Sequence, residues 1–325
     1  DAVRTLLQQG ADVNGAHGDG MSALHWAAER GDGEMGQMLI YAGAAVDAVT
    51  RIGQYTPLHV ASTAGRARVI ALLLESGADV SAGTTTSGVT PLHLAAASGS
   101  VEAVSTLLDH GADIDARESA WEQSPLIFAA ASDRVDVIDV LLERGADPAL
   151  TAKTVDLLID GQFAGEARTV QRAVLEAFSA DDTTPTPSQV QAAVLAGRAY
   201  YLSAGEEEDE EEAEEEDGEE GEKEEAEEDD DDRPRPTIAA KGGLTALLHA
   251  ARQGYLGAVT ALLDGGADID QVSAADDTSP LLMAAINAQF DLAMVLIERG
   301  ADPNLVASIN GVSPLWATVN AEWQP

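Results

Sequence analysis

The chain has 325 residues, of which 57 are acidic and 18 are basic, and its formal net charge is −39. This charge argues against nucleic acid or an anionic membrane surface as a partner, because binding to either needs a basic surface. The sequence contains no cysteine, so disulfides, thiolate metal sites and cysteine nucleophiles are excluded. No apolar run is long enough to cross a bilayer, so we expect no membrane insertion.

One sequence pattern, Thr-Pro-Leu-His or a variant of it, returns at a constant interval through most of the chain. We call this pattern the first mark and the interval between its copies the repeat length. A second mark, Gly-Ala-Asp or Gly-Ala-Ala, follows the leucine of the first mark at the same distance in every complete unit. The constant spacing predicts a rigid packed element, and the segment between units, which tolerates one extra residue, predicts a surface loop. The first mark is Thr-Pro-Leu-His or a variant of it, with its leucine at Leu24, Leu58, Leu92, Leu126, Leu247, Leu281 and Leu315.

The constant segment predicts two short helices. In the unit that begins at Thr90, the threonine oxygen can cap the first helix, and the proline after it suits the first helical turn. His93, at the third helical position, can reach back to the cap as in a capping box. Apolar residues at helical spacing follow a break at Ser98-Gly99, and Gly111 favours a left-handed end to the second helix. The polar loop that follows each unit predicts a projecting hairpin.

These units resemble the ankyrin repeat, because Thr-Pro-Leu-His, an alanine pair, a leucine pair and Gly-Ala-Asp occur in that order. The resemblance covers about 1–180 and 237–325. It implies an all-α solenoid of helix–turn–helix repeats with β-hairpin fingers, interrupted by an acidic insertion. The alanine-rich units are similar to those of the large multi-ankyrin proteins of bacteria. That likeness implies a soluble protein of the bacterial cytoplasm or periplasm, and the sequence does not choose between the two.

Departures from the pattern divide the chain into segments. The tract at 206–232 is acidic at 22 of its 27 positions, which predicts a disordered, self-repelling insertion. The repeats after it are too few to be stable alone, so we expect them to pack on the first block or on further repeats of the same chain. A half repeat at each end suggests a fragment of a longer chain. The expected segments are 1–149 (a half repeat and four repeats), 150–180 (a degenerate repeat), 181–205 (a linker that can hold a short helix), 206–236 (the disordered insertion) and 237–325 (two repeats and a half repeat).

The residues that could carry chemistry have simpler structural interpretations. Stacked helices lie about 8–10 Å apart, too far for histidines that recur once per repeat to share a zinc ion, so we interpret His25, His59 and His93 as capping residues. Residues 31–36 match a GxGxxG string, but they fall between two helices and not after a strand. The sequence therefore predicts no enzyme, no cofactor and no bound metal. The remaining histidines, interpreted as surface or packing residues, are His17, His110 and His249.

The resemblance implies that a partner binds the concave face, which finger tips and first helices form in ankyrin proteins. Aromatic residues, methionine and arginine are favoured anchors at protein interfaces. For the aromatic residues on first helices, packing between repeats is an alternative role that stays open. The candidate partner-binding residues are Trp26, Arg51, Gln54, Tyr55, Thr85, Glu118, Trp121 and Phe128.

Three hypotheses for function follow from the sequence. The first is a non-enzymatic scaffold that binds a protein or peptide on the concave face of the solenoid. The alternative is the regulatory or targeting part of a larger enzyme or effector whose other domains lie outside this chain. A second alternative is weak Ca²⁺ or Mg²⁺ binding by the acidic arm, since carboxylates suit both ions.

Overall fold

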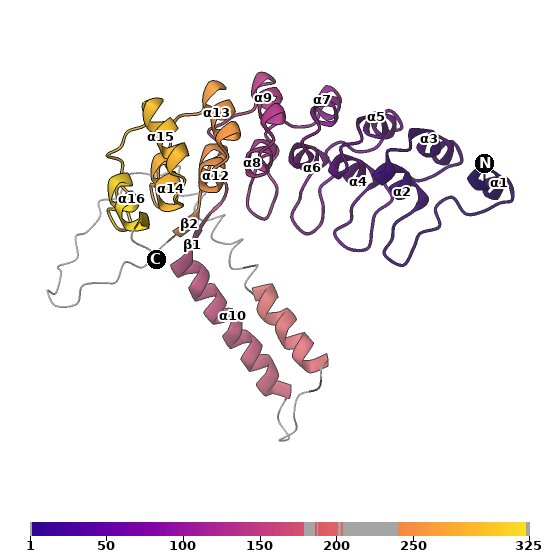
Figure 1. Cartoon of the computed structure of the whole chain (residues 1–325). Helices are drawn as coiled ribbons and strands as arrows, with labels where there is room; N and C mark the ends of the chain where they lie inside the picture. The colour runs from indigo at the N-terminus through magenta and orange to yellow at the C-terminus, as the bar shows by residue number, and fades with distance from the viewer. Residues whose placement is uncertain (1, 179–185, 187, 201–202, 204–239, 323–325) are drawn as a thin grey trace, which may run out of the picture. The chain divides into compact units, whose positions relative to one another are not determined.

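The computed structural model describes residues 2–178, 186, 188–200, 203 and 240–322 (Figure 1). The chain divides into two compact units, one formed by Asp1–Thr154 with Gly242–Pro325 and the other by Val155–Lys241. The first unit is a solenoid of helix pairs, as the repeats predict. The tract that we expect to be disordered, residues 206–236, lies outside the described residues.

The solenoid consists of two rows of short helices (Figure 1). Each inner helix packs on its neighbours in the inner row, the outer helices from α3 to α13 pack on one another in order, and most inner helices also pack on the outer helix of their own repeat. The inner row is α2 (Ala23–Arg30), α4 (Pro57–Thr63), α6 (Pro91–Ser98), α8 (Pro125–Ala131), α12 (Ala246–Gln253), α14 (Pro280–Ile286) and α16 (Pro314–Glu322). The outer row is α1 (Ala2–Gln8), α3 (Gly33–Tyr41), α5 (Ala67–Glu75), α7 (Val101–Asp109), α9 (Val135–Glu143), α13 (Leu256–Asp264) and α15 (Phe290–Glu298).

Small and branched apolar side chains form a core between the two rows, and a separate small cluster lies at its C-terminal end. The inner helices contribute an alanine pair, such as Ala95 and Ala96, and both side chains are fully buried. Because alanine is small, neighbouring helices can approach closely at these positions. Larger buried residues come from both rows, such as Leu92 of α6 and Ile70 and Leu73 of α5. This alternation of small and large residues explains how a core with few aromatic residues is closely packed.

The recurring histidines cap the inner helices and also join consecutive repeats. The backbone N–H groups of Ser22, Thr56 and Thr90 donate to Nδ1 of the histidine at the third helical position, at 3.1, 3.2 and 3.3 Å. Nε2 of each histidine then donates to a backbone carbonyl of the next finger. The three contacts are His25 to Tyr55 at 3.0 Å, His59 to Val89 at 3.2 Å and His93 to Gln123 at 2.9 Å.

The turn between the helices of a repeat explains the GxGxxG string. Gly31 has φ of +72° and ends α2 in the left-handed conformation. The Asp32 carboxylate then accepts a hydrogen bond from the backbone N–H of Met35 at 2.9 Å and caps α3. The string therefore lies between two helices, as expected, and serves as a tight turn.

The solenoid continues directly across the insertion. Helix α8 packs on α12, and α9 packs on α13, although the whole second unit separates the members of each pair in sequence. When Val155–Lys241 is left out of the count, the spacing from Gly145 to Leu247 equals that from Gly77 to Leu92. The second unit is therefore inserted into one finger of an otherwise regular solenoid, and the block after it packs on the first block.

Two short strands lie where the insertion begins and ends. Strands β1 (Thr154–Asp156) and β2 (Ala240–Gly242) form a two-stranded sheet. Below it, the backbone N–H of Gly243 donates to the carbonyl of Lys153 at 3.1 Å, and that of Ala152 donates to the carbonyl of Leu244 at 3.0 Å. These bonds close the base of the finger, so the two ends of the insertion meet side by side.

The segment that the sequence assigns to a degenerate repeat has a different structure. A single helix, α10 (Leu157–Phe178), occupies it within the second unit. The interpretation of 150–180 as a repeat of the solenoid is therefore wrong. The apolar residues at helical spacing belong to one long helix, and Thr151 to Lys153 belong to the interrupted finger.

A second helix at 188–200 lies beside α10 in the inserted unit (Figure 1). Thr186 begins it with a capping arrangement in which its backbone N–H donates to the Gln189 side chain at 2.8 Å. A Cβ at Gly197 would lie 2.8 Å from the carbonyl oxygen of Ala167 in α10, so glycine allows the two backbones to approach closely. The hydroxyl of Tyr200 donates to Glu166 at 2.7 Å. The linker predicted to hold a short helix thus forms half of a helical hairpin.

Candidate partner-binding surface

The fingers are joined to one another by a row of backbone hydrogen bonds. The N–H of Arg51 donates to the carbonyl of Asp19 at 2.8 Å, and the N–H of Thr85 donates to Gly53 at 3.1 Å. The row then continues through the finger that carries the insertion and beyond it. Its later members are Ser119 to Ser87 at 2.8 Å, Lys153 to Trp121 at 2.7 Å, Ala274 to Gly243 at 3.1 Å and Ser308 to Asp276 at 2.9 Å. The fingers are therefore fixed relative to one another before any partner binds.

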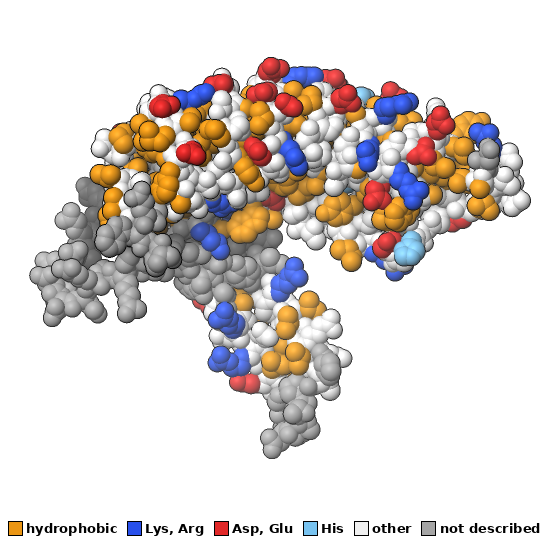
Figure 2. Space-filling view, viewed as in Figure 1, with side chains coloured by type: hydrophobic (Ala, Val, Ile, Leu, Met, Phe, Trp, Pro, Cys, Tyr) orange, Lys and Arg blue, Asp and Glu red, His pale blue; other side chains and the backbone are white. Residues whose placement is uncertain are grey.

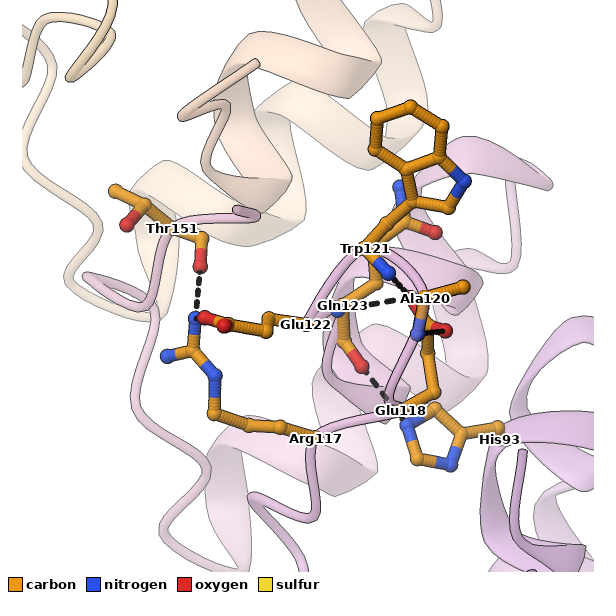
Figure 3. Close-up of polar contacts among 8 residues, drawn as sticks. All are labelled: His93, Arg117, Glu118, Ala120, Trp121, Glu122, Gln123 and Thr151. Carbon is orange, nitrogen blue, oxygen red and sulfur yellow. Dashed lines mark hydrogen bonds and ion pairs between the residues drawn. The ribbon is translucent and has the colours of Figure 1, made fainter. Parts of the chain in front are cut away.

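Glu118 organises the inside of its finger (Figure 3). Its carboxylate accepts hydrogen bonds from the backbone N–H groups of Ala120 at 2.8 Å, Trp121 at 2.7 Å and Gln123 at 3.3 Å. The residue is only 2% exposed, so it does not face a partner. The expectation that Glu118 is a binding residue is therefore corrected to a structural role inside the loop.

Some other fingers have a serine or threonine hydroxyl at the position equivalent to Glu118. These positions lie a whole number of repeat lengths from Glu118 when the inserted residues are not counted. Thr50 Oγ1 accepts from the N–H of Tyr55 at 3.0 Å, and Thr84 Oγ1 accepts from that of Val89 at 3.1 Å. Ser273 Oγ accepts from the N–H of Thr278 at 3.3 Å after the insertion. The recurrence of an oxygen acceptor at this position of the repeat was the feature of the sequence that could have indicated a structural role for Glu118.

The finger that contains Trp121 is also tied to the following finger (Figure 3). The Arg117 guanidinium donates to the Glu122 carboxylate at 2.8 Å and to the carbonyl of Thr151 at 2.7 Å. The indole of Trp121 points away from the Glu118 carboxylate in this view, and it is 47% exposed. A large aromatic side chain is thus held at the surface of a loop whose backbone is fixed from both sides.

Tyr55 and Phe128 are less available than Trp121. The Tyr55 ring is half-buried and meets the His59 ring edge to face, with centroids 5.8 Å apart. The Phe128 ring is half-buried on α8 and meets the His93 ring in the same way at 5.0 Å. Both rings cover capping histidines, so each combines packing between repeats with a partly accessible edge.

The remaining candidates are exposed at one end of the solenoid. Trp26 on α2 is 45% exposed, and Arg51, Gln54 and Thr85 are exposed on two fingers. Gln54 has φ of +52°, and it lies one repeat length after Gly20, whose φ is +89°. The backbone turn thus places Gln54 at the tip of its finger.

Sequence reasoning missed Ile52, which lies between Arg51 and Gly53 on the same finger. Its side chain is 83% exposed, which is unusual for a large apolar residue. The residue type alone gave no signal, because an isoleucine in a repeat protein is more often a core residue. Its position in the variable part of the loop, outside the repeating leucine positions, was the available clue.

The two rows of helices differ in charge. Helices α4, α6 and α8 contain no acidic residue, lysine or arginine. The outer helices beside them have exposed charged side chains, seen in Figure 2 as interspersed red and blue along the outer row. These outer charges are Arg68, Glu75, Glu102, Asp109, Asp136, Asp139 and Glu143. We call the exposed side of the inner helices, together with the finger tips, the inner surface.

One histidine of an inner helix lacks the partners of the capping histidines. His249 of α12 is 7% exposed, and its Nε2 has no hydrogen-bond partner. Its Nδ1 lies 3.5 Å from Nη2 of Arg252, one helical turn later. Burial, with a smaller contribution from the Arg252 charge, lowers the pKa of His249 to about 4. His249 is therefore a neutral donor at physiological pH.

In the described part of the chain, no group of three or more His, Asp or Glu side chains is placed to hold a metal ion. None of the helices in that part is both long and apolar enough to cross a bilayer.

Comparison with known proteins identifies the repeats. A family model described as ankyrin repeats matches the chain in three copies, at residues 1–84, 81–152 and 226–307. The matched residues make up more than half of the chain and leave 153–225 and 308–325 unmatched. No curated protein matches the chain.

Proposed function

Because the chain belongs to the ankyrin-repeat family, whose repeats generally mediate protein–protein interaction, we propose that it binds a protein or peptide on its inner surface. In this proposal the protein is a non-enzymatic scaffold. The partner lies along the inner helices and is contacted by the finger tips. The inserted unit is joined to the chain within one of these fingers and does not interrupt the stacking of the repeats.

The observation that carries the proposal is the difference in charge between the two helix rows. In a chain with a formal net charge of −39, three consecutive inner helices present only apolar or small polar side chains. Charged side chains, such as those on the outer row, would make this surface more costly to desolvate on binding. An uncharged strip bordered by polar residues is typical of a protein-binding surface.

Exposed anchors on the fingers and first helices support the same surface. Trp26, Ile52 and Trp121 are each close to half exposed or more, although such side chains favour burial. Tryptophan is enriched among the residues that dominate binding energy. The hydrogen-bond row between fingers holds Ile52 and Trp121 in place, so little conformational entropy is lost when a partner binds.

A double variant tests the proposal in the full chain. Ile52→Ala with Trp121→Ala removes two exposed anchors without touching the core. We expect binding of a partner captured with the wild-type chain, and then purified, to weaken by roughly a hundredfold, since each anchor contributes on the order of 1–2 kcal/mol. Calorimetry or surface plasmon resonance would measure the change.

Tyr41→Ala is the matched control, because Tyr41 is 95% exposed at the end of the outer helix α3. This variant should bind like the wild-type chain. If Tyr41→Ala weakened binding while the double variant did not, the partner would bind the outer row, and the proposed surface would be wrong.

A further inference from the structure

The helical hairpin of the inserted unit pairs its two antiparallel helices through small residues (Figure 1). A Cβ on Gly197 would lie 2.8 Å from the carbonyl oxygen of Ala167 and 3.3 Å from Cβ of Gln171, both in α10. Ala193, one turn before Gly197, is fully buried. These positions define the side on which each helix meets the other.

Residues of a different kind follow these contact positions by one place in the sequence. One residue along an α-helix turns a side chain by about 100°, and in an antiparallel pair this turn carries the side chains of both helices to the same side of the hairpin. Their spacing of three or four residues places them in one stripe on each helix. We call the two stripes together the hairpin face, and they consist of Arg168, Arg172 and Leu175 of α10 and Val190, Val194 and Arg198 of the second helix.

The three arginines lie at one end of the hairpin face. Arg198 directly follows Gly197, which meets the turn of α10 that holds Arg168 and Arg172. All three side chains are exposed, and none forms an ion pair within the described residues, not even Arg172 with Glu176 one turn later. A cluster of unneutralised positive charge is thus kept in a chain whose formal net charge is −39.

The other end of the hairpin face is apolar. Val190 is 41% exposed and Val194 is 48% exposed, and Leu175 on α10 is half-buried. Exposed basic and apolar side chains are both visible on the inserted unit in Figure 2. The apolar side chains offer no hydrogen bond to a segment that covers them, so that segment must satisfy its own backbone groups. An α-helix does so, whereas an extended peptide does not.

We propose that the hairpin face binds an acidic amphipathic α-helix of a partner protein, which packs as the third helix of a small bundle. Carboxylates on the partner helix pair with the three arginines, since each guanidinium can bind a carboxylate through two N–H groups. Apolar residues further along the same stripe of the partner helix cover the valines and Leu175. The hairpin face belongs to the inserted unit and the inner surface to the solenoid, so this inference does not rest on the proposed function.

The acidic tract of the chain itself matches only half of this face. Residues 206–232 are acidic at 22 of 27 positions, and the other five are alanine, glycine and lysine. The tract can supply carboxylates to the arginines, but it has no large apolar side chain to cover Val190 and Val194. The combination of charge and apolar surface therefore favours a partner helix that carries both kinds of residue.

A designed peptide tests the hairpin face in the full chain. The probe is a capped, alanine-based helix of about 18 residues, long enough to be helical by itself. One stripe of it has three glutamates in the first half and three leucines in the second half, and a second probe with the halves exchanged covers the opposite chain direction. Fluorescence anisotropy is measured at pH 7.5 and physiological ionic strength, where the net charge of the chain acts over only about 8 Å. We expect one probe to bind saturably and its glutamine version not to bind.

Variants of the chain separate the face from its surroundings. Arg172→Gln should weaken the probe by about tenfold, the scale of one charge-assisted contact, and Val194→Ala by about fivefold, because apolar surface is no longer covered. Leu195→Ala is the matched control for the valine, since Leu195 is 56% exposed on the same helix but outside the hairpin face. Arg68→Gln is the matched control for charge, since Arg68 is exposed on an outer helix of the solenoid. Both controls should bind like the wild-type chain.

Four outcomes would overturn the inference. Equal binding of the glutamate and glutamine probes would remove the arginines from the interaction. Equal losses in Val194→Ala and Leu195→Ala would mean that no defined face is used. Binding only after deletion of 206–232 would make the chain's own tract the occupant. Binding to phosphatidylglycerol vesicles but to neither probe would assign the face to a membrane surface. The result for Ile52 and Trp121 is independent of all four.

Discussion

The first three complete repeats and the last three begin their inner helices with different chemistry. In α2, α4 and α6 a buried histidine links the cap to the next finger. In α8, α12 and α14 the same position holds Ile127, Leu248 or Leu282, all buried. The hydroxyl caps persist in these helices, as Thr245 Oγ1 accepts from Leu248 N–H at 3.2 Å. A hydroxyl is therefore enough to start the helix, and the histidine adds a polar contact between repeats that apolar packing can replace.

Among the variants that test this difference between the repeats, His93→Ala should have the largest effect on stability. The variant removes a buried ring and leaves the Thr90 N–H and the Gln123 carbonyl without their partners. We expect a loss of about 4 kcal/mol in the free energy of unfolding, from the cavity and the unpaired groups together. Urea unfolding of the full chain, followed by circular dichroism, would measure it.

His93→Leu and Leu282→Ala are the matched controls. Leu282→Ala creates a cavity without unpairing a polar group and should cost about 3 kcal/mol. His93→Leu keeps the volume and loses only the polar contacts. If His93→Leu were as stable as the wild-type chain, the hydrogen bonds of the first repeats would add nothing beyond packing.

Acidification should weaken the first repeats more than the last. Burial lowers the pKa of His25, His59 and His93 below the ordinary value of 6.5. The unfolded chain therefore binds more protons below pH 6.5, and the free energy of unfolding falls as the pH decreases through that value. Hydrogen exchange at pH 7.5 and pH 5, read by mass spectrometry, should show a greater loss of protection in α4 and α6 than in α14, which has no histidine.

His249 adds a contribution to the pH dependence of α12. Because its pKa is about 4 in the folded chain, His249 should lower the free energy of unfolding by about 2 kcal/mol when the pH falls from 7.5 to 5. His249→Phe should remove this part and leave the response of α4 and α6 unchanged. An equal loss of protection in all inner helices would contradict the assignment to histidine.

The smallest expected effect is that of deleting the insertion. Joining Thr154 directly to Gly242 restores a finger of ordinary length at the point where β1 and β2 meet. Because α8 already packs on α12 and α9 on α13, the thermal midpoint of the solenoid should change by no more than about 3 °C, which corresponds to about 1 kcal/mol. Differential scanning calorimetry would measure it. Separate melting of the two blocks in the deletion variant would show that they are not one solenoid.

The repeating part of the fold could be predicted from the sequence because local rules determine it. Thr90, His93 and Gly111 act within a few residues of their own positions, as cap, capping box and left-handed turn. The constant repeat length then reproduces the same local solution in each unit. Residues 150–180 were misassigned because apolar residues at helical spacing suit a repeat helix and a long hairpin helix equally.

The candidate surface was harder to predict, because it depends on exposure and not on residue type. Glutamate is usually a surface residue, but Glu118 is buried, and its carboxylate accepts hydrogen bonds from three backbone N–H groups. Isoleucine is usually a core residue, but Ile52 is exposed at a finger tip. The role of His249 depends on which contacts its ring lacks. Only the three-dimensional arrangement shows that.

The inserted unit has a consequence for how the chain folds. Neighbouring inner helices are one repeat length apart in sequence, except α8 and α12, whose leucines Leu126 and Leu247 are more than three times as far apart. Closing this longer loop costs about 1 kcal/mol more than closing an ordinary one. Folding of ankyrin-type stacks spreads from one unit to its neighbour, so the α8–α12 contact is a kinetic boundary. The first block should form quickly, and the docking of the repeats after the insertion onto it should be the slower, later step.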